Sequence, residues 1–168
     1  MGVFVGSLMD WDAIGAIGET VGALAVVISL IYLAVQIRNQ NLESKAATVQ
    51  QVLQHNAATI SQLQDPDLAQ IWITGLGDID ALSDVERLRF VMYITTVLRD
   101  YENAYFQWRN GRLDDETWFT LMAVVRDVKS TPMYSQILEI RRHHFRPEFI
   151  KYMDELEVGD YSYIKKTL

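Results

Sequence analysis

The chain has 168 residues, a formal net charge of −7 and no cysteine. The lack of cysteine excludes disulfides, thiolate catalysis and zinc sites built on cysteine. The acidic balance argues against a nucleic-acid partner, because proteins that bind nucleic acid present a basic face to the phosphates.

The segment 21–37, VGALAVVISLIYLAVQI, contains no charged residue. At ~1.5 Å per helical residue it covers roughly 26 Å, slightly less than the ~30 Å hydrocarbon core of a bilayer. Starting the helix at Ala13 gives ample length and places Glu19 near an interface, where a carboxylate costs far less than at the bilayer centre. We predict a transmembrane helix over 13–37, after a short extracytoplasmic leader over 1–12. The alternative is a buried helix of a soluble protein, which usually has a shorter apolar run.

The charges on either side of this segment predict its orientation. The N-terminal part carries Asp10, Asp12 and Glu19 but no Lys or Arg, which is unlike the positive leader of a secretory signal peptide. Positive charge begins only after the segment, at Arg38 and Lys45. The positive-inside rule therefore places the N-terminus outside and the rest of the chain in the cytoplasm.

Small residues recur on one face of the predicted span. In lipid, helices associate through such faces because small side chains allow the backbones to approach closely. Two polar residues continue the face and could form hydrogen bonds across an interface. The predicted transmembrane interface comprises Gly15, Gly18, Gly22, Ala25, Ser29, Tyr32 and Gln36. We expect membrane lipid around it, and other membrane protein subunits or a second copy of the chain against it.

Residues 38–159 carry the start and stop signals of several helices. Proline follows a capping residue at the start of some, and a capping box opens the longest. Asp65-Pro66 starts the first of these helices and Gly77 ends it, and Ser83 with Glu86 opens the longest, which ends at Arg109 before Asn110-Gly111. Asp114 starts the next helix and Thr131-Pro132 the one after it. The last helix starts at Pro147 and ends near Gly159. No segment alternates as a strand would. The predicted fold is all-α, with one N-terminal transmembrane helix, a small helical bundle over 38–159 and an irregular tail over 160–168.

The segment 38–64 contains no Gly or Pro, so the membrane helix is expected to continue into it. Its apolar positions recur at spacings of three and four, as in a short heptad pattern. They are Leu42, Ala46, Val49, Leu53, Asn56, Ile60 and Leu63. The pattern either packs on the chain's own domain or pairs two copies of the chain, with Asn56 fixing the register; we favour the first.

Four segments together resemble a large family of uncharacterised bacterial membrane proteins. They are SLIYLAVQIRNQN, DPDLAQIWITGL, YENAYFQWRNGRLDDETW and FRPEFIKYMDEL. The resemblance covers the chain from about Val21 and implies one N-terminal span in the bacterial inner membrane and a small helical cytoplasmic domain. It implies no activity and no catalytic residue. One departure is Arg146, where such sequences typically have Ser or Thr as the cap of the last helix.

No catalytic motif is present, and we expect neither a cofactor nor a metal. Glu102 lies among aromatic residues of the longest predicted helix, where a carboxylate can act as an acid or base. More often such a group is held by an arginine or a tyrosine hydroxyl. The candidate pocket comprises Tyr101, Glu102, Tyr105 and Trp118.

The densest group of positive residues forms a candidate contact patch for phosphate headgroups or an acidic partner. It comprises Arg141, Arg142, Arg146 and Lys151. A solvated face is the alternative. We expect a membrane-anchored interaction module, an accessory or scaffolding subunit of a larger membrane complex. The alternatives are a homo-oligomeric membrane sensor and a ligand-binding or enzymatic domain with a site near Glu102.

Overall fold

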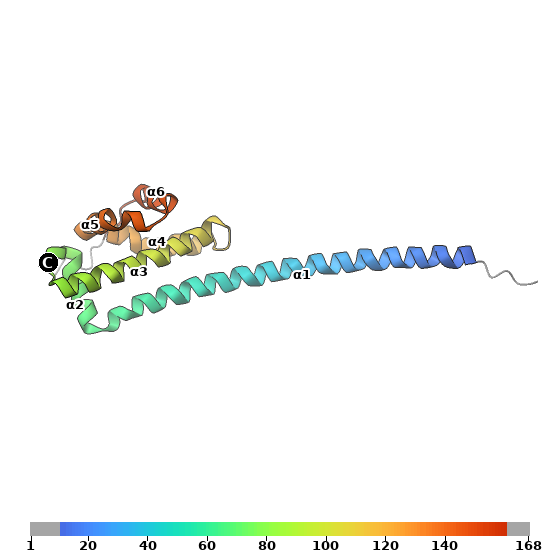
Figure 1. Ribbon diagram of the computed structural model, residues 1–168, viewed down its shortest axis with the longest axis horizontal. Helices are drawn as coiled ribbons and strands as arrows, with labels where there is room; N and C mark the ends of the chain where they lie inside the picture. Colours follow the sequence, from blue (N-terminus) through green and yellow to red (C-terminus); the bar gives the residue numbers. More distant parts are fainter. Residues whose placement is uncertain (1–10, 161–168) are drawn as a thin grey trace, which may run out of the picture. The chain divides into compact units, whose positions relative to one another are not determined.

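The computed structural model describes residues 11–160, which form six α-helices and three short 3-10 helices, with no strand among them (Figure 1). The all-α prediction is therefore confirmed. The predicted leader lies outside the described residues except for Trp11 and Asp12, which begin the first helix. The predicted tail lies outside them except for Asp160.

The chain divides after Glu43 into two compact units. Helix α1, Trp11–Ser61, begins in the first unit and ends in the second, which confirms that the apolar helix continues past the predicted span. Within the first unit this helix is long and apolar enough to cross a membrane, and none of that segment is buried by the residues that the structure describes.

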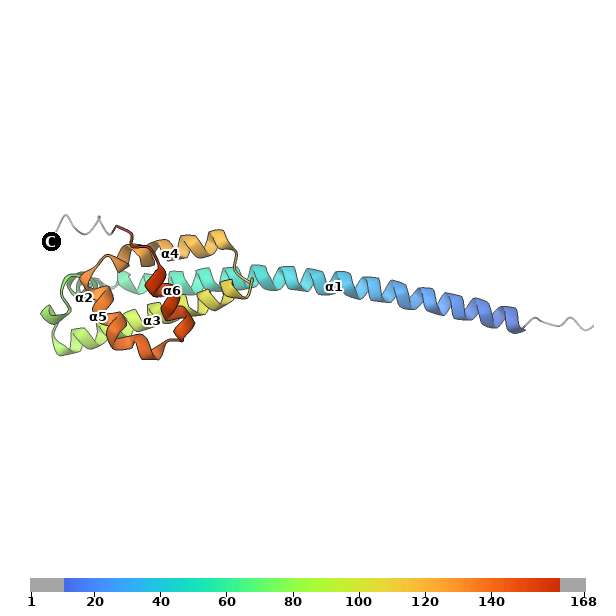
Figure 2. The same ribbon diagram turned by 90° about the horizontal axis from the view of Figure 1, so that it is seen from above.

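The second unit holds the last turns of α1 and the other helices. These are α2 Pro66–Gly77, α3 Asp84–Arg109, α4 Asp115–Lys129, α5 Pro132–Arg141 and α6 Pro147–Glu155. The 3-10 helices are η1 Gln62–Gln64, η2 Ile79–Ala81 and η3 Arg142–His144. Figure 2 shows α4, α5 and α6 gathered along α3, the longest helix of this unit, and α2 beside its N-terminal half.

The predicted helix starts are confirmed where a side chain caps the helix. The Asp65 carboxylate accepts the backbone N–H of Leu68 at 2.8 Å, and Asp114 likewise accepts that of Thr117 at 2.8 Å. The capping box of Ser83 and Glu86 is formed in both directions. Such caps satisfy N–H groups that have no partner inside the helix.

The ends of the helices follow the predictions less closely. Gly111 has φ 66°, the left-handed conformation that glycine adopts without strain after a helix. Helix α6 ends at Glu155, earlier than the predicted stop near Gly159. The backbone N–H of Gly159 instead donates to the carbonyl oxygen of Arg126 at 2.8 Å, which holds this segment against α4.

The buried side of this part of α1 is rotated about the helix axis relative to the predicted heptad-like stripe. Val52 and Thr59 are the buried residues of this part of α1, whereas the predicted Leu53 and Ile60 are exposed. The residues that face the domain are therefore one position away from part of the predicted stripe. Packing on the chain's own domain is nevertheless the arrangement that the structure has.

The core is rich in aromatic and sulfur-containing side chains. Trp118, Phe90, Phe149 and Met153 are fully buried, and Met122 is almost fully buried. The core extends along α3 to every other helix of the second unit. A single continuous core therefore positions the side chains described next.

Candidate functional site

The predicted pocket around Glu102 is a structural contact. Glu102 is buried, and its carboxylate pairs with Arg99 on the same helix. Its other oxygen accepts the backbone N–H of Arg146 at 2.7 Å. Arg99 also donates to the carbonyl oxygen of His144 at 2.9 Å. Glu102 and Arg99 thus fasten the turn before α6 to α3, and both carboxylate oxygens have partners.

Tyr105 and Trp118 belong to an aromatic cluster that joins α3, α4 and α6. Trp118 stacks on Trp108 with ring centroids 5.3 Å apart. Its indole N–H donates to the hydroxyl of Tyr152 at 3.0 Å, and Tyr105 packs against Tyr152 at 5.1 Å between centroids. Of the four residues of the predicted pocket, Tyr101 lines the polar cleft described next, whereas Glu102, Tyr105 and Trp118 do not.

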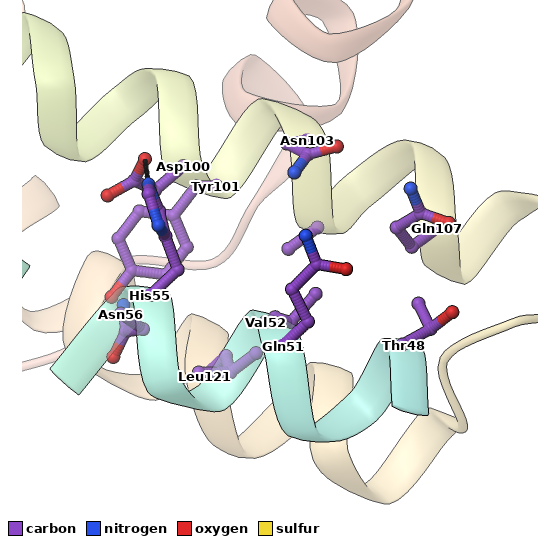
Figure 3. A pocket seen from close by; sticks show the side chains of 11 residues that line it. Thr48, Gln51, Val52, His55, Asn56, Asp100, Tyr101, Asn103, Gln107 and Leu121 are labelled. Atoms are coloured by element: carbon purple, nitrogen blue, oxygen red, sulfur yellow. Dashed lines mark ion pairs between the residues drawn. The ribbon is translucent and has the colours of Figure 1, made fainter. Parts of the chain in front are cut away.

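A polar cleft of about 260 Å³ lies beside Tyr101 (Figure 3). Helix α1 supplies one wall, α3 supplies the other, and α4 contributes the side chain of Leu121. Figure 3 shows Gln51 and Asn103 directed toward one another across the opening. The lining residues are Thr48, Gln51, Val52, His55, Asn56, Asp100, Tyr101, Asn103, Ala104, Gln107 and Leu121.

One carboxylate, that of Asp100, organises the polar groups at one place in the cleft lining. His55 Nε2 lies 3.1 Å from Asp100 Oδ1, and the hydroxyl of Thr59 donates to Asp100 Oδ2 at 2.6 Å. The Asp100 side chain is 11% exposed, whereas that of His55 is 65% exposed. Asp100 therefore fixes the imidazole by one nitrogen and leaves the rest of the ring open to solvent.

Two tyrosines complete the attachment of α1 to the domain. The Tyr93 hydroxyl donates to the carbonyl oxygen of Thr59 at 3.1 Å, in the last turn of α1, where a helix leaves carbonyl groups to be satisfied by other partners. Tyr101 forms a hydrogen bond with the side chain of Asn56. Burial raises the pKa of Tyr93 to about 12 and also raises the pKa of Tyr101, an effect that the Asn56 contact partly offsets.

The cleft offers hydrogen-bonding groups but no assembled catalytic set among the described residues. Its imidazole and its carboxylate are already paired with each other, and the Thr48 hydroxyl donates to the carbonyl oxygen of Ser44 at 2.9 Å. The described part of the chain contains no group of three or more His, Asp or Glu residues that could hold a metal ion. The arrangement therefore suits attachment of α1 or recognition of a neutral polar group.

Sequence reasoning missed the pairing of His55 with Asp100, because they lie on different helices and nothing local marks them as partners. Asn56 was the one useful signal. A polar residue in an otherwise apolar stripe indicates a buried partner, and Tyr101 is that partner.

The predicted basic patch is partly neutralised. Arg142 forms a two-pronged ion pair with Asp154, with N–O distances of 2.7 to 3.1 Å. Lys151 lies 3.9 Å from Glu155, and the guanidinium of Arg146 lies 4.4 Å from the centre of the Phe106 ring. Arg141 contacts the ring of His144 at 3.3 Å. The four residues are thus engaged separately, and they do not converge on one anion site.

The predicted membrane face is uncovered in the described chain. A Cβ atom added at Gly15, Gly18 or Gly22 would meet nothing within 4 Å. The Ser29 hydroxyl donates to the carbonyl oxygen of Ala25 at 2.8 Å, and the Gln36 amide donates to the Tyr32 hydroxyl at 2.7 Å. The polar groups at the end of this face therefore have partners within the helix, and the glycines leave room for a neighbouring backbone.

The candidate sites are thus an uncovered apolar helix, a polar cleft and an attachment built on Asp100. Comparison of the chain with protein-family models, with curated proteins and with solved structures gives no match in any of the three.

Proposed function

We propose that this chain is a membrane-anchored interaction module, an accessory or scaffolding subunit of a larger complex in the bacterial inner membrane. The observation that carries the proposal is the uncovered apolar surface of α1 over residues 14–37. Ile28 is 66% exposed there and Leu30 is 60% exposed. Soluble monomers rarely leave a contiguous apolar surface of this extent in water, since each Å² costs roughly 25 cal/mol. Lipid or a partner subunit would cover it.

The face of Gly15, Gly18 and Gly22 supports a helix partner within the membrane. Because their added Cβ atoms would meet nothing within 4 Å, a second helix can approach the backbone closely along this side. Van der Waals contacts between closely packed backbones stabilise such a helix pair, although the helix surface and the lipid are equally apolar. The same surface would serve another subunit or a second copy of the chain.

A stripe on α3 supports a second contact outside the membrane. Val85, Leu88 and Met92 are spaced by three and four residues on one side of the helix, and all are more than half exposed. An apolar stripe on a helix normally faces a packing partner.

The test is native mass determination of the full-length protein, extracted in a mild detergent, with identification of the proteins that accompany it. We expect a defined set of foreign subunits at a fixed ratio. The double change Gly18→Ile with Gly22→Ile should remove them, because two branched side chains block close approach. The matched control, Ala16→Ile with Ala23→Ile, places the same bulk on the other side of the helix and should retain them.

Two results would contradict this proposal. A lone monomer or a pure homo-oligomer would end the accessory-subunit assignment. Association that survives the Gly18 and Gly22 changes unaltered would show that this face is not the interface, and the stripe containing Leu88 would then be tested by Leu88→Glu.

A homo-oligomeric membrane sensor is the second candidate, and two exposed residues of the heptad-like pattern favour it. Leu53 and Ile60 are 44% and 45% exposed and lie seven residues apart on α1, where a second copy could meet them. Leu53→Gln with Ile60→Gln should then reduce the mass of the purified particle to that of a single chain. An unchanged mass would exclude pairing through these residues.

A further inference from the structure

The polar cleft between α1 and α3 is lined by side-chain amides that the rest of the described chain leaves without partners. Gln51 lies on α1, and Asn103 and Gln107 lie on α3. Within the part of the chain that the structure describes, the amide groups of these three side chains form no hydrogen bond. Figure 3 shows Gln51 and Asn103 facing one another across the opening. Each amide therefore offers two N–H donors and a carbonyl acceptor to whatever enters the cleft.

The charges in the cleft lining are already paired. Asp100 is the only carboxylate among the lining residues, and its two oxygens contact His55 at 3.1 Å and Thr59 at 2.6 Å. The lining contains no Arg or Lys. A charged occupant would therefore lose water without meeting an unpaired charge of opposite sign, which is costly. The cleft favours a neutral group that both donates and accepts hydrogen bonds.

Apolar side chains lie between the two polar walls of the cleft. Val52, Ala104 and Leu121 line it and are buried. Tyr101 is buried as well, and it also lines a second, mainly apolar cavity of about 290 Å³. The apolar surface of the cleft is thus small and suits short aliphatic side chains. A neutral molecule that combines amide groups with such side chains matches both parts of the lining.

The spacing of the amides matches the repeat of an extended polypeptide. Asn103 and Gln107 are four residues apart on α3, which separates them by ~6 Å along the helix axis. Peptide groups on the same edge of an extended chain recur every second residue, at roughly 6.7 Å. Asn103 and Gln107 can therefore bond to successive peptide groups on one edge, while Gln51 on the facing wall reaches the other edge.

We propose that the cleft binds an internal segment of an extended polypeptide, supplied by a partner protein, through its backbone amides. Thr48 and His55 are the first and last α1 residues with polar side chains facing this segment's path, seven residues or ~10 Å apart, which corresponds to about three extended residues. The segment carries small neutral side chains, and it is not a chain terminus, whose charge would stay unpaired. The site uses residues other than those of the proposed membrane interface and does not depend on that interface.

The experiment exploits the absence of cysteine in the chain. Ser44→Cys places one thiol on α1, one helical turn before Thr48. The full-length variant in lipid nanodiscs is equilibrated in a thiol buffer with the probe acetyl-Cys-Ala-Val-Ala-amide, and intact mass gives the fraction captured as a mixed disulfide. A matched probe has an ester oxygen in place of the valine N–H. We expect the amide probe to be captured about fivefold more strongly, the effect of one hydrogen bond.

Two further variants, each added to Ser44→Cys, identify the contacts. Gln51→Ala with Asn103→Ala should abolish the preference for the amide probe, because both walls lose an amide. Gln54→Ala is the matched control, since Gln54 is an exposed glutamine of α1 outside the cleft lining, and it should keep the preference. All three replaced side chains are exposed, so the unfolding temperature should stay that of Ser44→Cys.

Three results would overturn the proposal. Equal capture of the two probes by Ser44→Cys would show that the backbone of the probe is not recognised. The same preference in Ser135→Cys, at an exposed residue of α5 outside the lining, would make it a property of the probes. A preference that persists after Gln51→Ala with Asn103→Ala would place recognition outside the cleft. None of these results depends on whether the chain associates with other membrane subunits.

Discussion

Glu102 shows how a single buried carboxylate can hold two helices together. Its oxygens serve Arg99 and the backbone N–H of Arg146, so removing its charge affects both α3 and the turn before α6. We expect Glu102→Gln to lower the free energy of unfolding by about 2 kcal/mol, less than for a fully buried pair because Arg99 is half exposed.

Thermal unfolding of the purified full chain measures this effect. The control is Asp154→Asn, which breaks the exposed pair with Arg142 and should cost less than about 1 kcal/mol. Equal losses of unfolding free energy in the two variants would mean that burial of Glu102 does not increase the contribution of its ion pair to stability.

Two tyrosines predict how stability depends on alkaline pH. Burial raises the pKa of both Tyr93 and Tyr134 from 10.0 to about 12. The unfolded chain therefore loses these protons at lower pH than the folded chain, and the free energy of unfolding should fall as pH rises from 10 toward 12. Below pH 10 both states keep the protons, and these groups cause no pH dependence.

The measurement combines unfolding at several alkaline pH values with the ultraviolet absorbance of tyrosinate. Tyr134→Phe should reduce both the slope of stability against pH and the amplitude of the highest-pH titration step. A variant with the same slope as the parent chain would show that the Tyr134 hydroxyl is not shielded by burial.

At the scale of elements, α2 depends on a residue without a side chain. A Cβ atom added at Gly75 would lie 2.7 Å from the ring of Phe90, which is fully buried and cannot move aside freely. Gly75→Ala should therefore destabilise the domain by about 1 to 3 kcal/mol through overpacking, although alanine is the better helix former by about 1 kcal/mol.

Gly22→Ala is the matched comparison, because it also exchanges a helical glycine but meets nothing within 4 Å. It should leave the unfolding temperature of the helical domain unchanged. If Gly75→Ala were equally harmless, the result would contradict the close contact between Gly75 on α2 and the Phe90 ring on α3.

Another interelement contact joins the end of α4 to the end of α6. The ammonium group of Lys129 donates to the carbonyl oxygens of Met153, Asp154 and Leu156 at 2.5 to 2.9 Å. A cation at this position satisfies carbonyls that the last turn of a helix leaves open and interacts favourably with the helix dipole. Burial nevertheless lowers the pKa of Lys129, and the nearby Asp154 carboxylate offsets part of this shift.

At the scale of the whole molecule, the charge pattern predicts orientation in the membrane. We expect the N-terminus outside the inner membrane and the domain inside, because basic residues appear only after the span. Since the chain has no cysteine, single cysteines can be introduced by Ser7→Cys and Ser44→Cys on either side of the apolar segment. A membrane-impermeant maleimide should label the first in intact spheroplasts and the second only after lysis. The reverse pattern would place the domain outside.

Local sequence signals were sufficient for the helix starts and for recognising the long apolar helix. Caps such as Asp65, Ser83 and Asp114 act on N–H groups two or three residues away, so their effect can be read along the chain. A proline at the start of α2, α5 and α6 acts in the same local way. The length and apolar character of the span likewise need no knowledge of other segments.

Only the tertiary structure decided which side chains meet. Thr59 reaches Asp100 across 41 residues of sequence, and Glu102 reaches the backbone of Arg146 across 44. Apolar periodicity predicts that a helix face is buried, but it does not specify its rotation to within one residue, which is why Thr59 faces the domain where Ile60 was expected.

The sequence by itself thus determined an all-α chain, its helix starts and its long apolar helix, because these depend on groups within a few residues of each other. The tertiary structure decided that Glu102 is a structural tie, and that Tyr101 contributes to the lining of two cavities. The physical reason is that a cavity is the space that packing leaves unfilled. Its existence depends on the relative positions of several helices, and no single segment encodes them.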